Sequence, residues 1–151
     1  MEYQLARLVH VVAAIVAVGS NLTYWMWLRA AGRDRDRLRF VITGIRRIDR
    51  RLALPAYLVL LGSGLVMASI GPFHLFDADA LWLTAGLGLY IVVAVLGVAA
   101  FAPALRRLLA ASEIDPESAA SRTAARTTDR LFVITVAAVA TILVLMLLKP
   151  F

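Results

Sequence analysis

Four long apolar runs without a charged residue divide this chain of 151 residues. The runs contain no Lys, Arg, Asp or Glu, and they cover residues 8–28, 52–70, 81–102 and 131–148. Each is about as long as an α-helix needs to cross a hydrocarbon layer of roughly 30 Å, at a rise of about 1.5 Å per residue. The runs therefore predict a single all-α transmembrane domain over residues 1–151, folded as a four-helix bundle.

The connections between the runs differ in charge. Of the 16 basic residues, 14 lie in two connections: nine arginines between residues 29 and 51, and five between residues 106 and 130. The connection at residues 71–80 has no basic residue and carries Asp77 and Asp79. Because short loops rich in Lys and Arg stay on the cytoplasmic side, the pattern predicts a multi-pass protein of the inner (plasma) membrane with both termini outside.

The composition supports a membrane environment and excludes several other classes. A chain that is 62% hydrophobic, with a mean hydropathy of +0.82, has more apolar surface than a soluble domain of this size can bury. The net charge of +6 lies beside the apolar runs, where orientation and anionic lipids account for it, so no nucleic-acid partner is expected. The chain has no Cys, which excludes thiolate metal sites and covalent haem attachment. The expected partners are the lipid bilayer and further copies of the chain or subunits of a larger membrane complex.

The first basic connection has the spacing of a helix. Leu38, Val41, Ile45 and Ile48 recur every three or four residues among arginines, which predicts an amphipathic cytoplasmic helix over residues 36–51 that leads into the second span. Its apolar stripe is expected at the headgroup level or beneath the bundle. Gly32 marks the break after the first span.

A polar stripe runs along the first span. Its members are spaced by three and four residues and so share one helix face, which is expected to turn toward the bundle: Arg7, His10, Ala14, Ala17, Asn21 and Tyr24. Tyr24 is also expected, with Trp25 and Trp27, in the aromatic belt at the inner end of the span.

His10 is the only histidine within the four runs, and an ionisable group inside a span is a candidate functional site. At about 1.5 Å per residue, His10 lies roughly 12 Å outward from the middle of its span. Three roles are open: a hydrogen bond across helices, ligation of haem or another metal, and proton relay. Arg7, one turn outward, either pairs with a carboxylate such as a haem propionate or anchors the helix end in the headgroups.

Soft metal ligands are expected together at the outer ends of the spans. These are His10, Met67, His74 and Met146, and their thioether and imidazole groups suit Cu(I). Methionine is also a common gap-filler in apolar cores, and no Met-x-Met or His-x-His spacing supports a copper site. No run contains a carboxylate, which argues against an ordinary proton-coupled transporter, and no motif assigns an enzymatic reaction.

Several short segments occur in the order and spacing of a known family. The first run reads LVHVVAAIVAVGS from residue 8, and the second is entered by RLALPA from residue 51. The third begins with Leu-Trp-Leu at residue 81, Pro103 follows it, and LLKP ends at residue 150. Together they resemble the bacterial integral membrane family catalogued as domain of unknown function 2269, over nearly the whole chain.

This family is distantly similar to the membrane domain of the copper-resistance protein CopD and to HemJ, a haem-associated protoporphyrinogen oxidase. HemJ also has a histidine early in its first span, so the resemblance implies that His10 lies near a tetrapyrrole or a metal. HemJ has a lysine shortly after a tryptophan in its third span, whereas this chain reads Trp82-Leu83-Thr84. The resemblance therefore implies a ligand site without assigning a reaction.

Three functions are open at this point. The first is a haem- or tetrapyrrole-associated bundle, with His10 as an axial ligand and Arg7 near a propionate. The second is a non-catalytic membrane subunit or a small-molecule permeation module in which His10 is structural. The third is copper handling at the outer face.

Overall fold

The computed structural model describes residues 1–72 and 75–149, and His74 therefore lies outside the described residues. The described residues form four long helical segments, joined by short turns. These segments are α1 (Glu2–Ala31); α2 (Arg35–Ile48), η1 (Asp49–Ala53) and α3 (Leu54–Ile70); α4 (Leu81–Leu96), η3 (Gly97–Phe101) and α5 (Ala102–Ile114); and α6 (Ala119–Leu148). A short 3-10 helix, η2 (Ala78–Ala80), precedes α4.

All four segments are long and apolar enough to cross a membrane. Each predicted run lies inside one of them, so the expected all-helical fold with four apolar helices is confirmed. The helices extend past the runs because charged residues end an apolar stretch without ending a helix. Within the first connection, Leu38, Val41 and Ile45 are buried on α2, whereas Ile48 is exposed.

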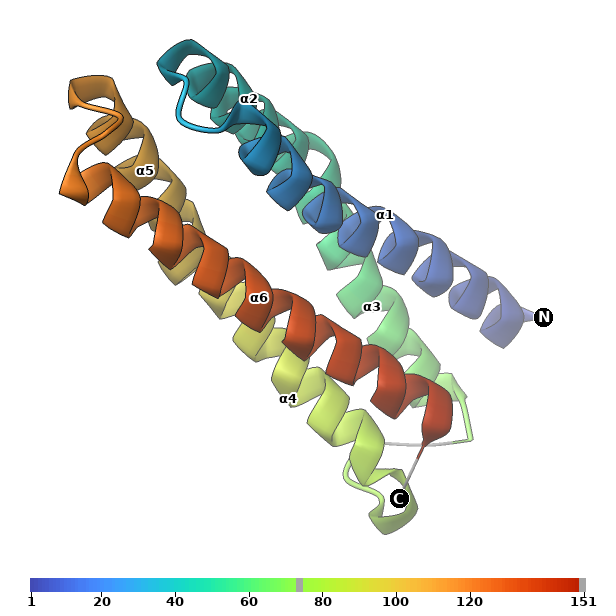
Figure 1. The fold of residues 1–151 in the computed structure, drawn as a ribbon. Coiled ribbons are helices and arrows are strands. Elements are labelled where there is room, and N and C mark those ends of the chain that lie inside the picture. Colours follow the sequence, from blue (N-terminus) through green and yellow to red (C-terminus); the bar gives the residue numbers. More distant parts are fainter. Residues whose placement is uncertain (73–74, 150–151) are drawn as a thin grey trace.

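The helices pack as two antiparallel pairs. In the first hairpin (residues 1–70) α1 packs along α3, and in the second hairpin (residues 81–149) α6 packs along α4 and α5. The hairpins meet where α2 contacts α5 and α1 contacts α6, and among the described residues the backbone of α3 does not come close to that of α4 or α6. Figure 1 shows α2 and α5 at one end of the molecule, with the start of α1 and the end of α6 toward the opposite end.

The segments α2–η1–α3 and α4–η3–α5 each continue through a proline in the same way. Pro55 and Pro103 each follow a π-helical turn, in which the residue just before the proline donates its N–H five residues back: Leu54 to Asp49, and Ala102 to Gly97. Proline lacks an N–H and its ring clashes with the preceding turn, and the wider π turn relieves that conflict. Pro103 therefore lies inside a continuous helical segment instead of at the start of a loop.

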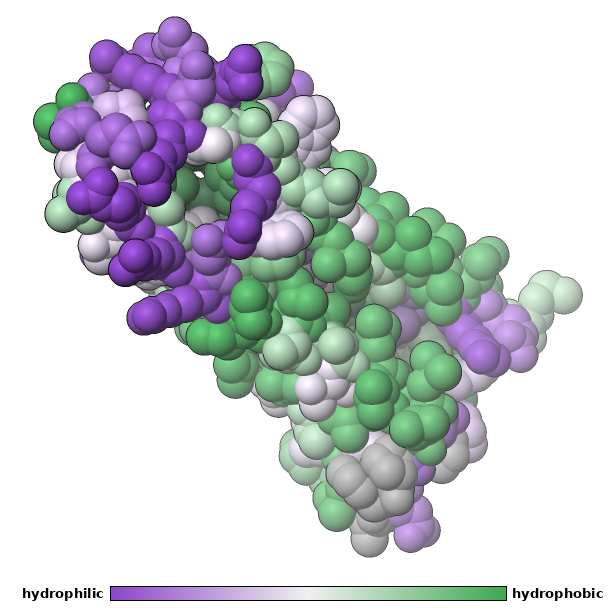
Figure 2. Space-filling view, viewed as in Figure 1, coloured by the Kyte–Doolittle hydropathy of each residue, from purple (hydrophilic) through white to green (hydrophobic). Residues whose placement is uncertain are grey.

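The buried core lies at the α2/α5 end of the molecule. Its fully or nearly buried members come from α1, α2 and α5: Tyr24, Ala31, Leu38, Val41, Ile42, Ile45, Leu105 and Leu108. Along α3, α4 and α6, by contrast, large apolar side chains such as Leu58, Val95 and Val133 are exposed. Figure 2 shows the hydrophilic residues gathered at the α2/α5 end and green apolar surface over most of the length beyond it.

Three ion pairs join the two hairpins around this core. Arg29 pairs with Asp129 at 3.7 Å, Arg33 with Glu117 at 2.7 Å, and Arg39 with Glu113 at 2.8 Å. Each pair is exposed and contributes little stability alone, roughly 0–1 kcal/mol. Together they favour one alignment of the hairpins at this end.

Gly32 ends α1 in a backbone conformation that requires glycine. Its φ of 60° and ψ of −127° lie in a region that side chains with a Cβ rarely adopt. We expect Gly32→Ala to destabilise the protein by about 1–3 kcal/mol, measured by thermal or denaturant unfolding in detergent. The matched control is Gly44→Ala within α2, where an added Cβ meets nothing within 4 Å. That change should stabilise by about 0.5–1 kcal/mol, and equal losses at both positions would contradict the prediction.

Candidate functional site

His10 is held by a serine on the neighbouring helix. Its Nδ1 lies 3.1 Å from Ser63 Oγ, between α1 and α3, and the imidazole is half-buried. The Ser63 hydroxyl lies 2.6 Å from the Val59 carbonyl oxygen and 3.2 Å from that of Leu60, and it donates its proton there. Oγ is therefore an acceptor for Nδ1–H, and the network assigns the tautomer in which Nε2 keeps its lone pair.

The imidazole packs closely on α3 because a glycine follows the serine. A Cβ added at Gly64 would lie 3.1 Å from His10 Cε1 and 3.5 Å from Nδ1. A side chain there would push the ring away from Ser63. Gly62, one residue before the serine, has open space around it and makes no such contact. The segment 62–64 therefore provides both the acceptor and the room that fix the position of His10.

The other predicted site residues are distributed over both hairpins. Arg7 is exposed on α1, where it makes no ion pair within the part of the chain that the structure describes. Met67 is partly buried on α3, one turn from Ser63 toward the C-terminal end of that helix. Met146 lies in the second hairpin, where its Cε packs against Gly86 of α4. Within residues 1–72 and 75–149, no group of three His, Asp or Glu is placed to hold a metal ion.

A second polar cluster crosses between the hairpins nearer the α2/α5 end. Asn21 on α1 donates to the Ala17 carbonyl oxygen at 3.0 Å and also to the Tyr57 hydroxyl on α3. Tyr90 on α4 donates to the Tyr57 carbonyl oxygen at 2.8 Å, and the two tyrosine rings lie 6.3 Å apart, centroid to centroid. This cluster links α1, α3 and α4 through side chains, and it brings α3 and α4 into contact although their backbones do not come close.

The geometry is that of a membrane bundle with polar groups on its inward faces, and comparison with known families agrees. A family model described as "Predicted integral membrane protein (DUF2269)" matches residues 4–150. The chain belongs to this family. No curated protein and no solved structure matches the chain. The resemblance to domain of unknown function 2269 is thereby confirmed, and this DUF2269 member is a multi-pass integral membrane protein with four apolar helices.

In this DUF2269 chain the polar stripe of α1 faces inward over most of its length. Ala17 and Tyr24 are fully buried, and His10, Ala14 and Asn21 are partly buried. The expected place of Tyr24 in an aromatic belt is wrong, because Tyr24 is only 2% exposed and belongs to the core. Its hydroxyl is buried without a hydrogen-bond partner in the described part of the chain.

Sequence reasoning missed Ser63, Tyr57 and Tyr90 as members of these polar contacts. Ser63 had a recognisable signal, since a hydroxyl between two glycines in an apolar run is typical of a close helix contact. Tyr57 and Tyr90 had a weaker one, because a tyrosine inside an apolar run needs a partner for its hydroxyl. In each case the partner depends on which helices are neighbours, and that is not visible in the spacing of one helix.

Proposed function

We propose that this protein is a tetrapyrrole-binding membrane bundle in which His10 Nε2 is an axial ligand of haem. The observation that carries the proposal is the hydrogen bond from His10 Nδ1–H to Ser63 Oγ. Ligating histidines commonly donate their second ring N–H to an oxygen, which fixes the tautomer and the orientation of the ring. His10 has this arrangement, with Nε2 as the nitrogen that is left to bind a metal.

The surroundings of His10 also fit a large apolar ligand. In the described residues the backbone of α3 does not come close to that of α4 or α6, and the apolar side chain of Val66, one turn along α3 from Ser63, is exposed. A flat apolar macrocycle could cover such surfaces, which are otherwise left to lipid. Bound haem would supply a redox-active iron. Arg7, exposed one turn outward from His10, is the residue that we assign to a propionate.

One histidine fills one axial position. We infer that the other stays open or is filled by His74 or by a second subunit, either another copy of this chain or a component of a larger membrane complex. Met67 lies on the same hairpin as His10, whereas Met146 is engaged with Gly86 in the other hairpin. The contacts of Met146 therefore favour packing over ligation.

We further propose that the protein lies in the bacterial inner membrane with both termini outside and α2 and α5 in the cytoplasm. Cysteines introduced at Arg33 and Ser118 should be labelled only from the cytoplasmic side, and cysteines at Asp77 and at the C-terminus only from outside. The reason is the basic charge concentrated at the α2/α5 end, away from the termini. Labelling of Arg33 and Asp77 from the same side would contradict this orientation.

Metal content separates the haem proposal from the two alternatives. Protein purified from cells grown with sufficient iron and copper should contain iron in stoichiometric amount and no matching copper. Stoichiometric copper would favour copper handling by His10 and Met67. Absence of both metals would favour a non-catalytic subunit or permeation module, in which the Asn21–Tyr57 and His10–Ser63 contacts only hold helices together.

A further inference from the structure

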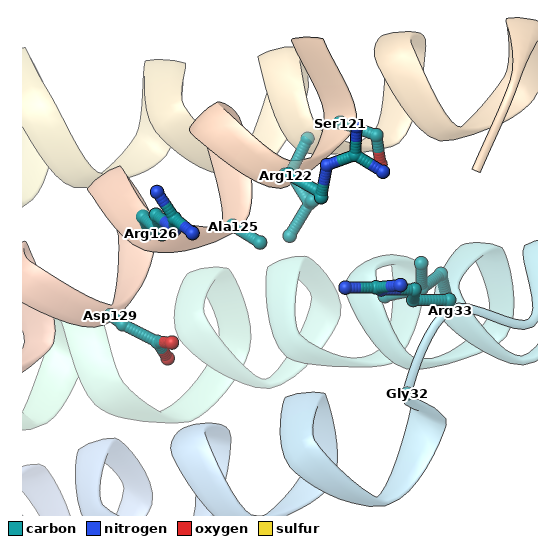
Figure 3. A pocket seen from close by; sticks show the side chains of 9 residues that line it. Gly32, Arg33, Ser121, Arg122, Ala125, Arg126 and Asp129 are labelled. Carbon is teal, nitrogen blue, oxygen red and sulfur yellow. The ribbon is translucent and has the colours of Figure 1, made fainter. Parts of the chain in front are cut away.

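A second site lies far from His10, in a pocket where the two hairpins meet. The pocket has a volume of about 210 Å³ and is open on one side. The turn after α1 and the start of α2 form one wall, and α5 and α6 form the other. Figure 3 shows Arg33 on one side of the space and Arg122 and Arg126, which project from α6, on the other.

The pocket carries an excess of positive charge. Its lining includes Arg33, Arg122 and Arg126 but only one carboxylate, that of Asp129. Asp129 is already paired with Arg29 at 3.7 Å, so it does not neutralise the three arginines of the lining.

Among the residues that the structure describes, a carboxylate pairs with Arg33 but not with Arg122 or Arg126. Arg33 Nη1 donates to Glu117 at 2.7 Å, and Arg122 Nη1 donates to the Glu117 carbonyl oxygen, which is neutral. Arg126 makes no hydrogen bond or ion pair with any residue that the structure describes. Arginine guanidinium groups suit a phosphate, because phosphate accepts several charge-assisted hydrogen bonds at once.

The pocket also lies beside an aromatic pair and an arginine of the kind found at the membrane surface. Trp25 stacks on Phe132 with their ring centroids 5.8 Å apart, and the Arg29 guanidinium lies 4.8 Å above the Trp25 ring. Tryptophan and arginine in this arrangement are typical of the boundary between hydrocarbon and headgroups. Asp129 is one turn along α6 from Phe132, so the pocket begins near the depth of lipid phosphates.

We propose that this pocket binds a phosphate-bearing anion, which bridges Arg33 of the first hairpin and the pair Arg122 and Arg126 of the second. The ligand chemistry is a phosphate group, supplied by an anionic phospholipid headgroup or by a soluble phosphate compound. Binding adds charge-assisted hydrogen bonds from both walls beside the Arg33–Glu117 ion pair, and so strengthens the contact between the hairpins. The site is independent of His10 and of any haem.

The test compares the wild-type protein with Arg122→Gln/Arg126→Gln in nanodiscs. One arm uses phosphatidylcholine with and without phosphatidylglycerol, and the other uses pure phosphatidylcholine with inorganic phosphate or sodium chloride at equal ionic strength. The readouts are the melting temperature and, by native mass spectrometry, the retained phosphatidylglycerol. The matched control is Arg106→Gln/Arg107→Gln, which removes the same charge from exposed positions on α5 outside the pocket lining.

We expect phosphatidylglycerol or inorganic phosphate to raise the melting temperature of the wild-type protein and of the control. In Arg122→Gln/Arg126→Gln, the anion should bind about tenfold or more weakly, because charge-assisted hydrogen bonds are lost. A response to the lipid alone identifies a headgroup, and a response to inorganic phosphate identifies a soluble source. If the double variant does not fold, Arg126→Gln alone serves, since Arg126 has no partner to lose within the described residues. No response to either anion, or an equal loss in the control, would overturn the proposal.

Discussion

Replacing His10 by alanine should abolish haem binding while leaving the bundle folded. The imidazole supplies the Nε2 lone pair, and no other histidine lies within the four apolar runs. The fold should persist because the side chain is only half-buried and its hydrogen bond to Ser63 adds about 1–2 kcal/mol at most. The measurement is the haem content of purified His10→Ala, compared with its helical content by circular dichroism and its size by gel filtration.

Two further variants test whether the hydrogen bond to Ser63 positions His10 as a haem ligand. Ser63→Ala removes the acceptor of Nδ1–H and should weaken haem affinity by about 10–100-fold without abolishing binding. His74→Ala should have a smaller effect or none. Full haem content in His10→Ala would contradict the ligand assignment. Equal loss of haem in all three variants would indicate that haem content follows general stability instead.

Replacing Ile42 by alanine should cause the largest loss of stability that the fold predicts. Ile42 is 1% exposed and lies within the core at the α2/α5 end, where residues of α1, α2 and α5 surround it. Removing its methyl and methylene groups leaves a cavity there, and such changes cost about 2–5 kcal/mol. The measurement is the change in unfolding free energy or melting temperature in detergent.

Phe40 provides the matched control on the same helix. Its side chain is 76% exposed, so Phe40→Ala should change stability by less than about 0.5 kcal/mol despite removing a larger group. A comparable loss for Phe40→Ala and Ile42→Ala would show that burial against α1 and α5 is not what stabilises α2.

The four helices could be predicted because an uncharged apolar run of about 20 residues has few alternatives to a membrane helix. The place of the core could not, because spacing along one helix does not show which helices are neighbours. The exposed side chains of Leu58 and Val133 and the buried ones of Ile42 and Leu105 all look alike in sequence. The π turns before Pro55 and Pro103 were also missed, since a proline indicates a kink or a break and does not show how the turn before it adapts.

The candidate site was predictable in part for a related reason. The spacing of His10, Ala17 and Asn21 correctly indicated one inward-facing stripe on α1, because helical periodicity is a local property. The partners Ser63 and Tyr57 are more than 30 residues away along the chain. Their contacts depend on how α1 lies against α3, which local periodicity does not determine.

The absorption spectrum of the wild-type protein, purified from haem-replete cells, tests the haem proposal most directly. We predict a Soret band that copurifies with the chain through every step and that shifts when an exogenous imidazole or cyanide binds the iron. Wild-type protein that folds and purifies without colour, and that takes up no added haemin, would contradict haem ligation by His10. In that case the contacts of His10 with Ser63 and Gly64 would be structural contacts between α1 and α3.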